Sequence, residues 1–369
     1  MHDLASRLAQ YGAVTLLLYP TTGSASTQIT RQVADQPCAS CSLTIGEKLR
    51  LGDSDGPGVL GRLVTGAKLP GGRYVLSYDA NDAEMILFDS SGRFLGVAGR
   101  RGQGPGEYQF IRWLRSDSSR LYVFDGRLRR VTVLSSDMHF VRTAPLPGHL
   151  LGDAEPLGGG LVAVNSNIGS RQAAGLLHLV DDSGSIVRSM AGDSAGLRSD
   201  QSSNAWRPLA RGRSGSVWLA RRSWYRIERW ARTGLNELTI TRNAAWFRPH
   251  VMPRIQDAKS EPEPFIEDLW EDSSGRLWVL VTRSDGQWSR AAGPRIEGVV
   301  TAPDRNLFYD TVVEVIDPNT GALLASRRVD AHLTQFLGDG EAMSFTEDKD
   351  GIGRVIVWRL QLDVPRFRR

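Results

Sequence analysis

The stretch GRFLGVAGRRGQGPGEYQFIRWLRSDSSRLYVFDGRLRRVTVLSSDMHFVR (residues 92–142) alternates short apolar runs with turn residues, a pattern typical of β-strands. At its centre, three glycines occupy every second position from Gly102 to Gly106 and are followed by Glu107. Such a segment is either a loop that cradles phosphate or a connection between two parts of a β architecture. A dinucleotide-binding phosphate loop opens a helix, whereas another strand pattern follows here, and Pro105 removes one amide donor. The segment is therefore interpreted as a connection between strands.

Two kinds of segment recur along the chain, and each has the residue pattern of β structure. The first begins with glycine or serine and continues into an aromatic or β-branched centre; it occurs six times, at residues 72–78, 119–125, 159–165, 215–221, 275–281 and 340–346. The second is a hairpin whose polar turn suits glycine and side chains that cap their own backbone; it occurs at residues 85–97, 131–143, 177–189, 227–239 and 313–325. Each run precedes a hairpin, except the last, which precedes a single strand at residues 355–362.

A repeat of about 40–60 residues that carries about four short strands is typical of a β-propeller. Six runs predict six blades, so we expect an all-β, six-bladed β-propeller. The sixth repeat lacks an outer strand, while the strand-like residues 43–51 (LTIGEKLRL) belong to no repeat. We predict that this N-terminal strand closes the ring as the outermost strand of the last blade, which leaves no long unpaired edge. Residues 283–309 interrupt the fifth repeat, and we expect this long connection on a functional face.

Residues 92–142 resemble the propellers built from NHL repeats. Those repeats carry a glycine-rich turn that ends in an acidic or polar residue and an aromatic, then a strand of the form grlyVxD, then a strand that begins with Arg-Val or Arg-Ile. The corresponding residues here are Gly104, Glu107 and Tyr108, then LYVFD at 121–125, then Arg130 with its following valine. The GxGPGEY turn is similar to that of six-bladed propellers in exported bacterial proteins. The resemblance implies a propeller fold, export, and a glycine-rich segment that links neighbouring blades.

The first 27 residues have the composition of an export signal. A basic residue, Arg7, precedes a short apolar core at 13–19 (AVTLLLY), and small residues at 23–26 (GSAS) suit cleavage. The apolar core is shorter than the roughly 20 residues that a membrane-spanning helix needs. We therefore expect a periplasmic or extracellular protein with no membrane span after signal removal. The expected divisions are a signal peptide (1–27), a lead segment (28–42) and the propeller (43–365).

The chain has two cysteines, Cys38 and Cys41, in a CxxC pattern. A zinc site needs about four ligands, and the sequence holds no second cysteine pair. No βαβ pattern surrounds the motif, as a thioredoxin-like site requires, and Ser42 rather than histidine follows it, which excludes covalent haem attachment. In an oxidising compartment a local disulfide is the simplest interpretation. We predict that this disulfide pins the N-terminus of the mature chain.

Arginine and tryptophan concentrate in one part of the chain. The net charge is only +4, yet residues 206–248 contain ten arginines, two acidic residues and half of the ten tryptophans. Alternation along a strand at 224–230 would place four side chains on one face: Trp224, Arg226, Glu228 and Trp230. Such a face binds anionic glycans through stacking and forked hydrogen bonds; alternatively, the tryptophans pack between blades and the arginines extend along the rim. A basic patch alone is weak evidence for nucleic acid, which we do not expect in an exported protein.

The sequence offers little catalytic chemistry. The six histidines are scattered without metal-ligand spacing, and no GxSxG motif is present. Propeller enzymes hold a metal in the central channel, and a channel Ca or Zn would need carboxylates from inner strands. The acidic residues with suitable positions are Glu155, Glu267, Asp268 and Glu341.

The leading expectation is an exported propeller that binds a ligand or a protein, with no catalytic residues and no cofactor. The candidate binding residues are Arg222, Trp224, Arg226, Trp230, Gly104 and Glu107. The alternative is a metal-dependent lactonase, lyase or glycan-acting enzyme with its site at the central channel. A third possibility is a scaffold that docks an envelope protein through the insertion at 283–309. The expected partners are therefore an envelope protein or an anionic glycan.

Overall fold

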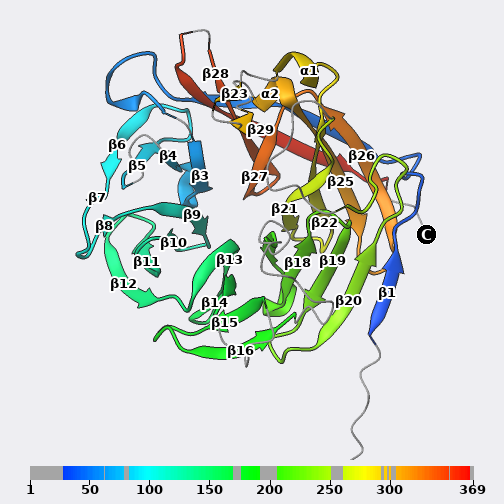
Figure 1. Ribbon diagram of the computed structural model, residues 1–369, viewed down its shortest axis with the longest axis horizontal. Helices are drawn as coiled ribbons and strands as arrows, with labels where there is room; N and C mark the ends of the chain where they lie inside the picture. Colours follow the sequence, from blue (N-terminus) through cyan, green and yellow to red (C-terminus); the bar gives the residue numbers. More distant parts are fainter. Residues whose placement is uncertain are drawn as a thin grey trace, which may run out of the picture.

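The six repeats fold into six sheets arranged as a ring around a central axis (Figure 1). The computed structural model describes residues 28–61, 63–78, 83–168, 176–191, 206–250, 261–291, 295–296, 299–300, 305–348 and 350–365. The predicted all-β, six-bladed β-propeller is confirmed. The predicted signal peptide, residues 1–27, lies outside the described residues.

Each blade has an antiparallel sheet of four strands, which follow one another from the axis to the rim. Blade 1 contains β3 (Leu63–Lys68), β4 (Tyr74–Tyr78), β5 (Met85–Phe88) and β6 (Phe94–Ala98). Blade 2 contains β9 (Ile111–Ser116), β10 (Arg120–Asp125), β11 (Arg130–Ser135) and β12 (Phe140–Pro145). Blade 3 contains β13 (His149–Gly158), β14 (Leu161–Asn167), β15 (Leu177–Val180) and β16 (Ile186–Met190).

The other three blades repeat this order with additions from the N-terminal segment. Blade 4 contains β17 (Leu209–Arg211), β18 (Val217–Arg221), β19 (Arg226–Trp230) and β20 (Asn236–Thr241). Blade 5 contains β21 (Phe265–Glu271), β22 (Leu277–Ser284), β25 (Tyr309–Asp317) and β26 (Ala322–Val329). Blade 6 contains β27 (Leu333–Gly338), β28 (Glu341–Glu347), β29 (Gly353–Asp363) and, at its rim, β2 (Ser42–Leu51). The glycine- or serine-led runs are the second strands of the blades, and the hairpins are the outer two strands of blades 1 to 5.

Strand β2 closes the ring, as the sequence predicted. It pairs antiparallel with β29 from Ser42 opposite Asp363 to Leu51 opposite Val355. The outer strand of blade 6 therefore comes from the N-terminal part of the chain and the other three come from the C-terminal part. Because the two ends of the fold share one sheet, opening the ring requires breaking a complete strand pair.

The lead segment also joins the ring, which the sequence did not indicate. Its strand β1 (Ile29–Gln32) pairs in parallel with β20 and adds a fifth strand to blade 4. The Cys38 amide then donates to Leu323 O of blade 5 at 2.8 Å. The predicted disulfide between Cys38 and Cys41 is present. Residues 28–51 thus run along the rim of blades 4, 5 and 6.

The hydrophobic core consists of six layers, and each layer lies between two neighbouring blades. Strand β22 shows how the sequence produces this arrangement. Trp278 and Leu280 pack toward blade 6, whereas Leu277, Val279 and Val281 pack toward blade 4. Successive side chains of a strand point to opposite faces, and both faces of a blade are covered, so the strand is apolar at five successive positions, 277–281.

Side chains join the innermost strands of neighbouring blades, which do not pair with each other as strands. Inner strands would otherwise leave buried backbone groups without partners. The bonds run from Leu114 N to Thr65 Oγ1 (3.1 Å), from Leu209 N to Asp153 Oδ2 (3.1 Å), from Phe336 N to Asp268 Oδ2 (2.7 Å) and from Gln335 Nε2 to Gly66 O (2.6 Å). We call these bonds the inter-blade latches.

Replacing Gln335 tests the contribution of one latch. Gln335 is buried and also accepts the Thr65 hydroxyl, so Gln335→Leu leaves several polar groups of blades 1 and 6 unsatisfied. An unsatisfied buried group costs about 1–3 kcal/mol, so we expect the free energy of unfolding in urea to fall by about 2 kcal/mol or more. The matched control is Gln361→Leu, at an exposed position of β29. Equal stability of the two variants would show that the latch contributes nothing.

Candidate functional site

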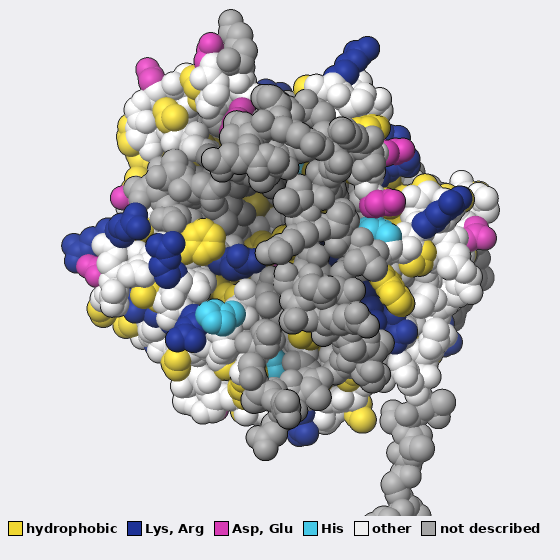
Figure 2. All heavy atoms as spheres, viewed as in Figure 1, with side chains coloured by type: hydrophobic (Ala, Val, Ile, Leu, Met, Phe, Trp, Pro, Cys, Tyr) yellow, Lys and Arg dark blue, Asp and Glu magenta, His cyan; other side chains and the backbone are white. Residues whose placement is uncertain are grey.

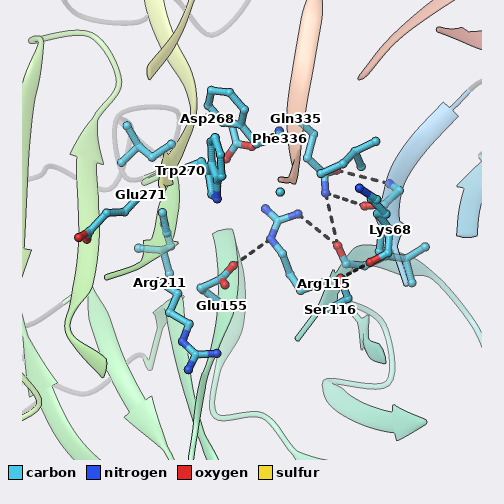
Figure 3. Close-up of a pocket in the computed structure, with 18 residues that line it drawn as sticks. Lys68, Arg115, Ser116, Glu155, Arg211, Asp268, Trp270, Glu271, Gln335 and Phe336 are labelled. Atoms are coloured by element: carbon cyan, nitrogen blue, oxygen red, sulfur yellow. Dashed lines mark hydrogen bonds and ion pairs between the residues drawn. The ribbon is translucent and has the colours of Figure 1, made fainter. Parts of the chain in front are cut away.

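The innermost strands β3, β9, β13, β17, β21 and β27 run in the same direction, because each blade is a four-stranded meander that restarts at the axis. Their C-terminal ends therefore meet at one face of the ring, where a hollow of about 220 Å³ opens. We call this hollow the channel mouth. Residues from all six strands line it, including Lys68, Arg115, Glu155, Arg211, Asp268, Trp270, Gln335 and Phe336 (Figure 3).

Arg115 lies at the centre of the channel mouth and is 9% exposed (Figure 3). Its Nη2 donates to Asp153 Oδ1 at 2.7 Å, and its Nε lies 3.3 Å from Glu155 Oε2. Asp153 also accepts the backbone amides of Ala154 and Leu209. The Arg115 guanidinium therefore pairs with two carboxylates, and Asp153 accepts more hydrogen bonds than Glu155 does.

Asp268 approaches the same arginine from β21. Its carboxylate accepts the Phe336 amide through an inter-blade latch, and it makes no ion pair with any residue that the structure describes. The groups that act on one another here are the cations Arg112, Arg115 and Arg211 and the carboxylates of Asp153, Glu155 and Asp268. Cations and carboxylates are equal in number, but Glu155 shares Arg115 with Asp153, and Asp268 has no described cation in ion-pair contact.

Burial raises the pKa of both carboxyl groups that have no arginine to themselves. Burial raises the pKa of Glu155 to about 8; the Asp153 and Asp268 carboxylates add to the shift, and Arg115 opposes it. Burial likewise raises the pKa of Asp268 to about 7, with Arg115 opposing and Asp153 adding to the shift. Glu155 and Asp268 therefore both change protonation state close to neutral pH.

Aromatic and charged side chains form the wall and the rim of the channel mouth. The rings of Trp270 and Phe336 lie 5.9 Å apart and face the hollow. At the rim, the Lys68 ammonium lies 3.2 Å from Glu341 and 3.3 Å from Asp339. Glu271 points away from the centre (Figure 3) and accepts Trp218 Nε1 at 2.6 Å. The wall therefore offers an aromatic surface beside buried carboxyl groups.

The predicted Arg and Trp face does not form as expected, because the strand begins at Arg226. Trp224 lies in the preceding turn and is 53% exposed. On the strand itself, alternation holds: Glu228 Oε1 accepts Arg226 Nε at 2.7 Å, and Glu228 Oε2 accepts Trp230 Nε1 at 3.1 Å. Since the turn from β18 to β19 lies at the opposite face from the turn between β17 and β18, Trp224 is remote from the channel mouth.

Arg222 is buried at that opposite face. Its guanidinium lies 3.9 Å from the Trp206 ring and 4.2 Å from the Phe265 ring, and it donates to Glu267 at 2.8 Å. Of the six candidate residues, the structure therefore brings Arg226 and Trp230 together through Glu228 and places Arg222 and Trp224 elsewhere.

The glycine-rich segment is the connection from the outer strand β6 to the inner strand β9. Its short strands β7 (Arg100–Arg101) and β8 (Glu107–Tyr108) pair in parallel, and Figure 2 shows Lys and Arg side chains at this part of the rim. The Glu107 carboxylate accepts the amides of Gln103 at 3.0 Å and Gly104 at 2.8 Å. These bonds, the Gly104 amide first, lower the pKa of Glu107. The two amides are therefore already used within the loop.

A side chain at Gly102 would displace the Glu107 carboxylate, because an added Cβ would lie 2.1 Å from Glu107 Oε2. Arg130 closes the loop from β11, donating to the carbonyls of Gln103, Gly104 and Glu107. The glycine-rich segment thus packs on itself at the rim.

The four carboxylates considered as metal ligands are dispersed. Glu155 and Asp268 line the channel mouth, Glu267 binds Arg222, and Glu341 is surrounded by Lys48, Lys68 and Arg359. Among the described residues, one group of carboxylates has its oxygen atoms close enough together to bind a metal ion: Asp285, Asp310 and Asp330, at the opposite face. Arg328 pairs with Asp310 there, so the group already has a counter-cation.

Comparison with known proteins agrees with the fold. No family model and no curated protein matches the sequence. A protein of Bacteroides fragilis thought to be exported is 13% identical, with a TM-score of 0.57 over 92% of this chain and 100% of that chain. A DUF4221 family member from Bacteroides vulgatus is 8% identical, with a TM-score of 0.60 over 88% of this chain and 99% of that chain. Among the described helices, none is long and apolar enough to cross a membrane.

Sequence reasoning found part of the channel mouth and missed its centre. Glu155 and Asp268 were identified as acidic residues at inner strands, whereas Arg115, Asp153 and Trp270 were not considered. The available signal was a charged residue within an otherwise buried inner strand, as in IRWLRS (111–116). The missing information was which inner strands face one another across the axis.

The pKa of Glu155 predicts how stability depends on pH. Because the folded pKa of about 8 lies above the ordinary value of 4.5, this carboxyl group takes up a proton on folding between these pH values, and its contribution to stability falls as the pH rises from about 5 to 8. Glu155→Gln should reduce this slope by about one proton, or about 1.4 kcal/mol per pH unit. Urea unfolding at pH 5, 6 and 7 measures the slope, with Glu237→Gln as the exposed control. An unchanged slope would contradict the raised pKa.

Proposed function

We propose that this chain is an exported binding module whose channel mouth takes a small polar ligand. The observation that supports this most is that six separate strands direct charged and aromatic side chains into one hollow. Ligand sites in proteins are concave, with aromatic walls and a few placed polar groups. The composition of residues 1–27 supports export.

The channel mouth provides both directional and non-directional contacts for a ligand. Glu155 and Asp268 accept hydrogen bonds when ionised and donate when protonated, and Arg115 is held between Asp153 and Glu155 by ion pairs. Trp270 and Phe336 offer ring faces for stacking. Because the inner strands are latched to one another, these groups keep their positions when no ligand is bound.

The anionic glycan expected from the arginine-rich segment has a separate candidate surface. A groove of about 500 Å³ between blades 4 and 5 is lined by Arg213, Arg229 and Arg232, but also by Glu237 and Glu271. Arg229 pairs with Glu237, and Arg232 donates to backbone carbonyls. These partners weaken the groove as an anion site, and we place the small ligand at the channel mouth instead.

Blocking the channel mouth tests the proposal. Both cysteines form the disulfide, so Ser116→Cys introduces a single reactive thiol at the rim, which fluorescein-5-maleimide can label. We expect ligand-observed NMR with a library of small amines, carboxylates and sugars to detect binders of the unlabelled Ser116→Cys protein that the label displaces. Labelled Ser91→Cys, on the outer hairpin of blade 1, should retain them. Binders unaffected by the Ser116 label, or no binders at all, would overturn the proposal.

The second candidate is an enzyme of the lactonase, lyase or glycan-acting kind with its site at the channel. The observation that favours it is that Glu155 and Asp268 change protonation near neutral pH, as general acids and bases do. Turnover of a lactone, ester or glycoside that Glu155→Gln lowers at least about 100-fold would establish this function. Turnover equal in Glu155→Gln and Glu237→Gln would assign the activity elsewhere.

A further inference from the structure

We infer that the ligand of the channel mouth carries a cationic nitrogen, an amine or a quaternary ammonium group, that lies between Glu155 and Asp268. This inference rests on the proposed binding function and names the chemical class of the ligand. Glu155 shares the Arg115 guanidinium with Asp153, and Asp268 makes no ion pair with a described residue, so these two carboxyl groups can take a further positive charge.

The other polar groups of the channel mouth do not supply that charge. Lys68 is engaged at the rim with Glu341 and Asp339. The Gln335 amide donates to Gly66 O at 2.6 Å and to Leu114 O at 3.4 Å, both within the latch between blades. The cations that act most strongly on Glu155 are Arg115 and Arg211.

The aromatic wall suits a cation as well. Trp270 packs against Trp278 at 5.6 Å and against Phe336 at 5.9 Å, and it lines the hollow beside Asp268. Arg115 lies over the Trp113 ring, 5.1 Å from its centroid, whereas no arginine or lysine of the described chain lies over Trp270. A ligand ammonium can therefore contact the face of Trp270 while its charge is balanced by the two carboxyl groups.

The same arrangement couples binding to protons. Without ligand, Glu155 and Asp268 hold protons because burial and the neighbouring Asp153 disfavour their ionised forms, which Arg115 and Arg211 offset only in part. A cation that enters favours the ionised forms, so protons leave for solvent as it binds. Affinity therefore rises with pH, by up to about tenfold per pH unit for each proton released.

Calorimetry with choline and its uncharged isostere 3,3-dimethylbutan-1-ol separates charge from shape. We expect the wild-type chain to bind choline at least tenfold more tightly than the isostere at pH 7.5. Affinity for choline should rise at least about tenfold from pH 6 to pH 8.5. Titrations in phosphate and in Tris, which differ in ionisation enthalpy, should show release of protons.

Variants connect this binding to the named residue. Glu155→Gln keeps the size of the side chain and removes its charge, and Glu155 takes no part in a latch; choline affinity should fall at least tenfold and proton release should decrease. Glu237→Gln, an exposed carboxylate of similar size, should bind choline as the wild type does.

The outcomes distinguish the ligand class from the binding function. Equal binding of choline and its isostere, or binding of acetate in preference to choline at a site that the Ser116 label blocks, would overturn the cationic ligand and leave the binding module. The cationic ligand would also be overturned if other small ligands bound but choline, methylammonium and ammonium did not bind at 50 mM. If the label blocked no probe of any charge, both proposals would fail.

Discussion

The pairing of β2 with β29 is the constraint on which the rest of this molecule depends. A propeller blade makes few backbone bonds to its neighbours, so the ring stays closed only if its first and last blades are tied together. Here residues 42–51 provide the rim strand of a blade whose other strands begin at residue 333. Closure fixes the angle between blades, and that angle brings six inner strand ends to one channel mouth.

Closure also explains why acidic side chains remain close together at the axis. Asp153 and Asp268 each accept a backbone amide from the inner strand of the next blade, Leu209 in one case and Phe336 in the other. They cannot turn away from each other without breaking a latch. The mutual repulsion of Asp153, Glu155 and Asp268 is therefore retained in the folded state and relieved by protons. A site that keeps unfavourable charge in this way gives up stability, as functional sites commonly do.

Much of the fold could be predicted from the sequence, because its signals are local. A glycine-led run with five successive apolar residues, as in GRLWVLV (275–281), indicates a strand buried on both faces, and the six runs fixed the number of blades. Counting strands assigned residues 43–51 to the last blade. The parallel strand β1 could not be predicted, since nothing in TQITRQ (27–32) identifies the distant β20 as its partner.

The site was less predictable because it depends on distances across the axis. Arg115 and Asp153 are 38 residues apart and meet only because blades 2 and 3 are adjacent. Trp224 was expected on a strand, but a turn precedes Arg226 and Tyr225 has a φ of +40°, so the alternation begins two residues later. Glu155 and Asp268 could be selected as inner-strand acids, whereas their shared arginine could not.

The incomplete compensation of Glu155 and Asp268 at the channel mouth is the central claim, and the titration of Glu155 tests it most directly. With ¹³C-labelled glutamate, the carboxyl resonance that disappears in Glu155→Gln can be followed by NMR as the pH changes. The account predicts a midpoint at about 8, far above the ordinary value of 4.5. A midpoint near 4.5 would mean that Arg115 and Arg211 fully compensate the carboxylate, and it would contradict the account.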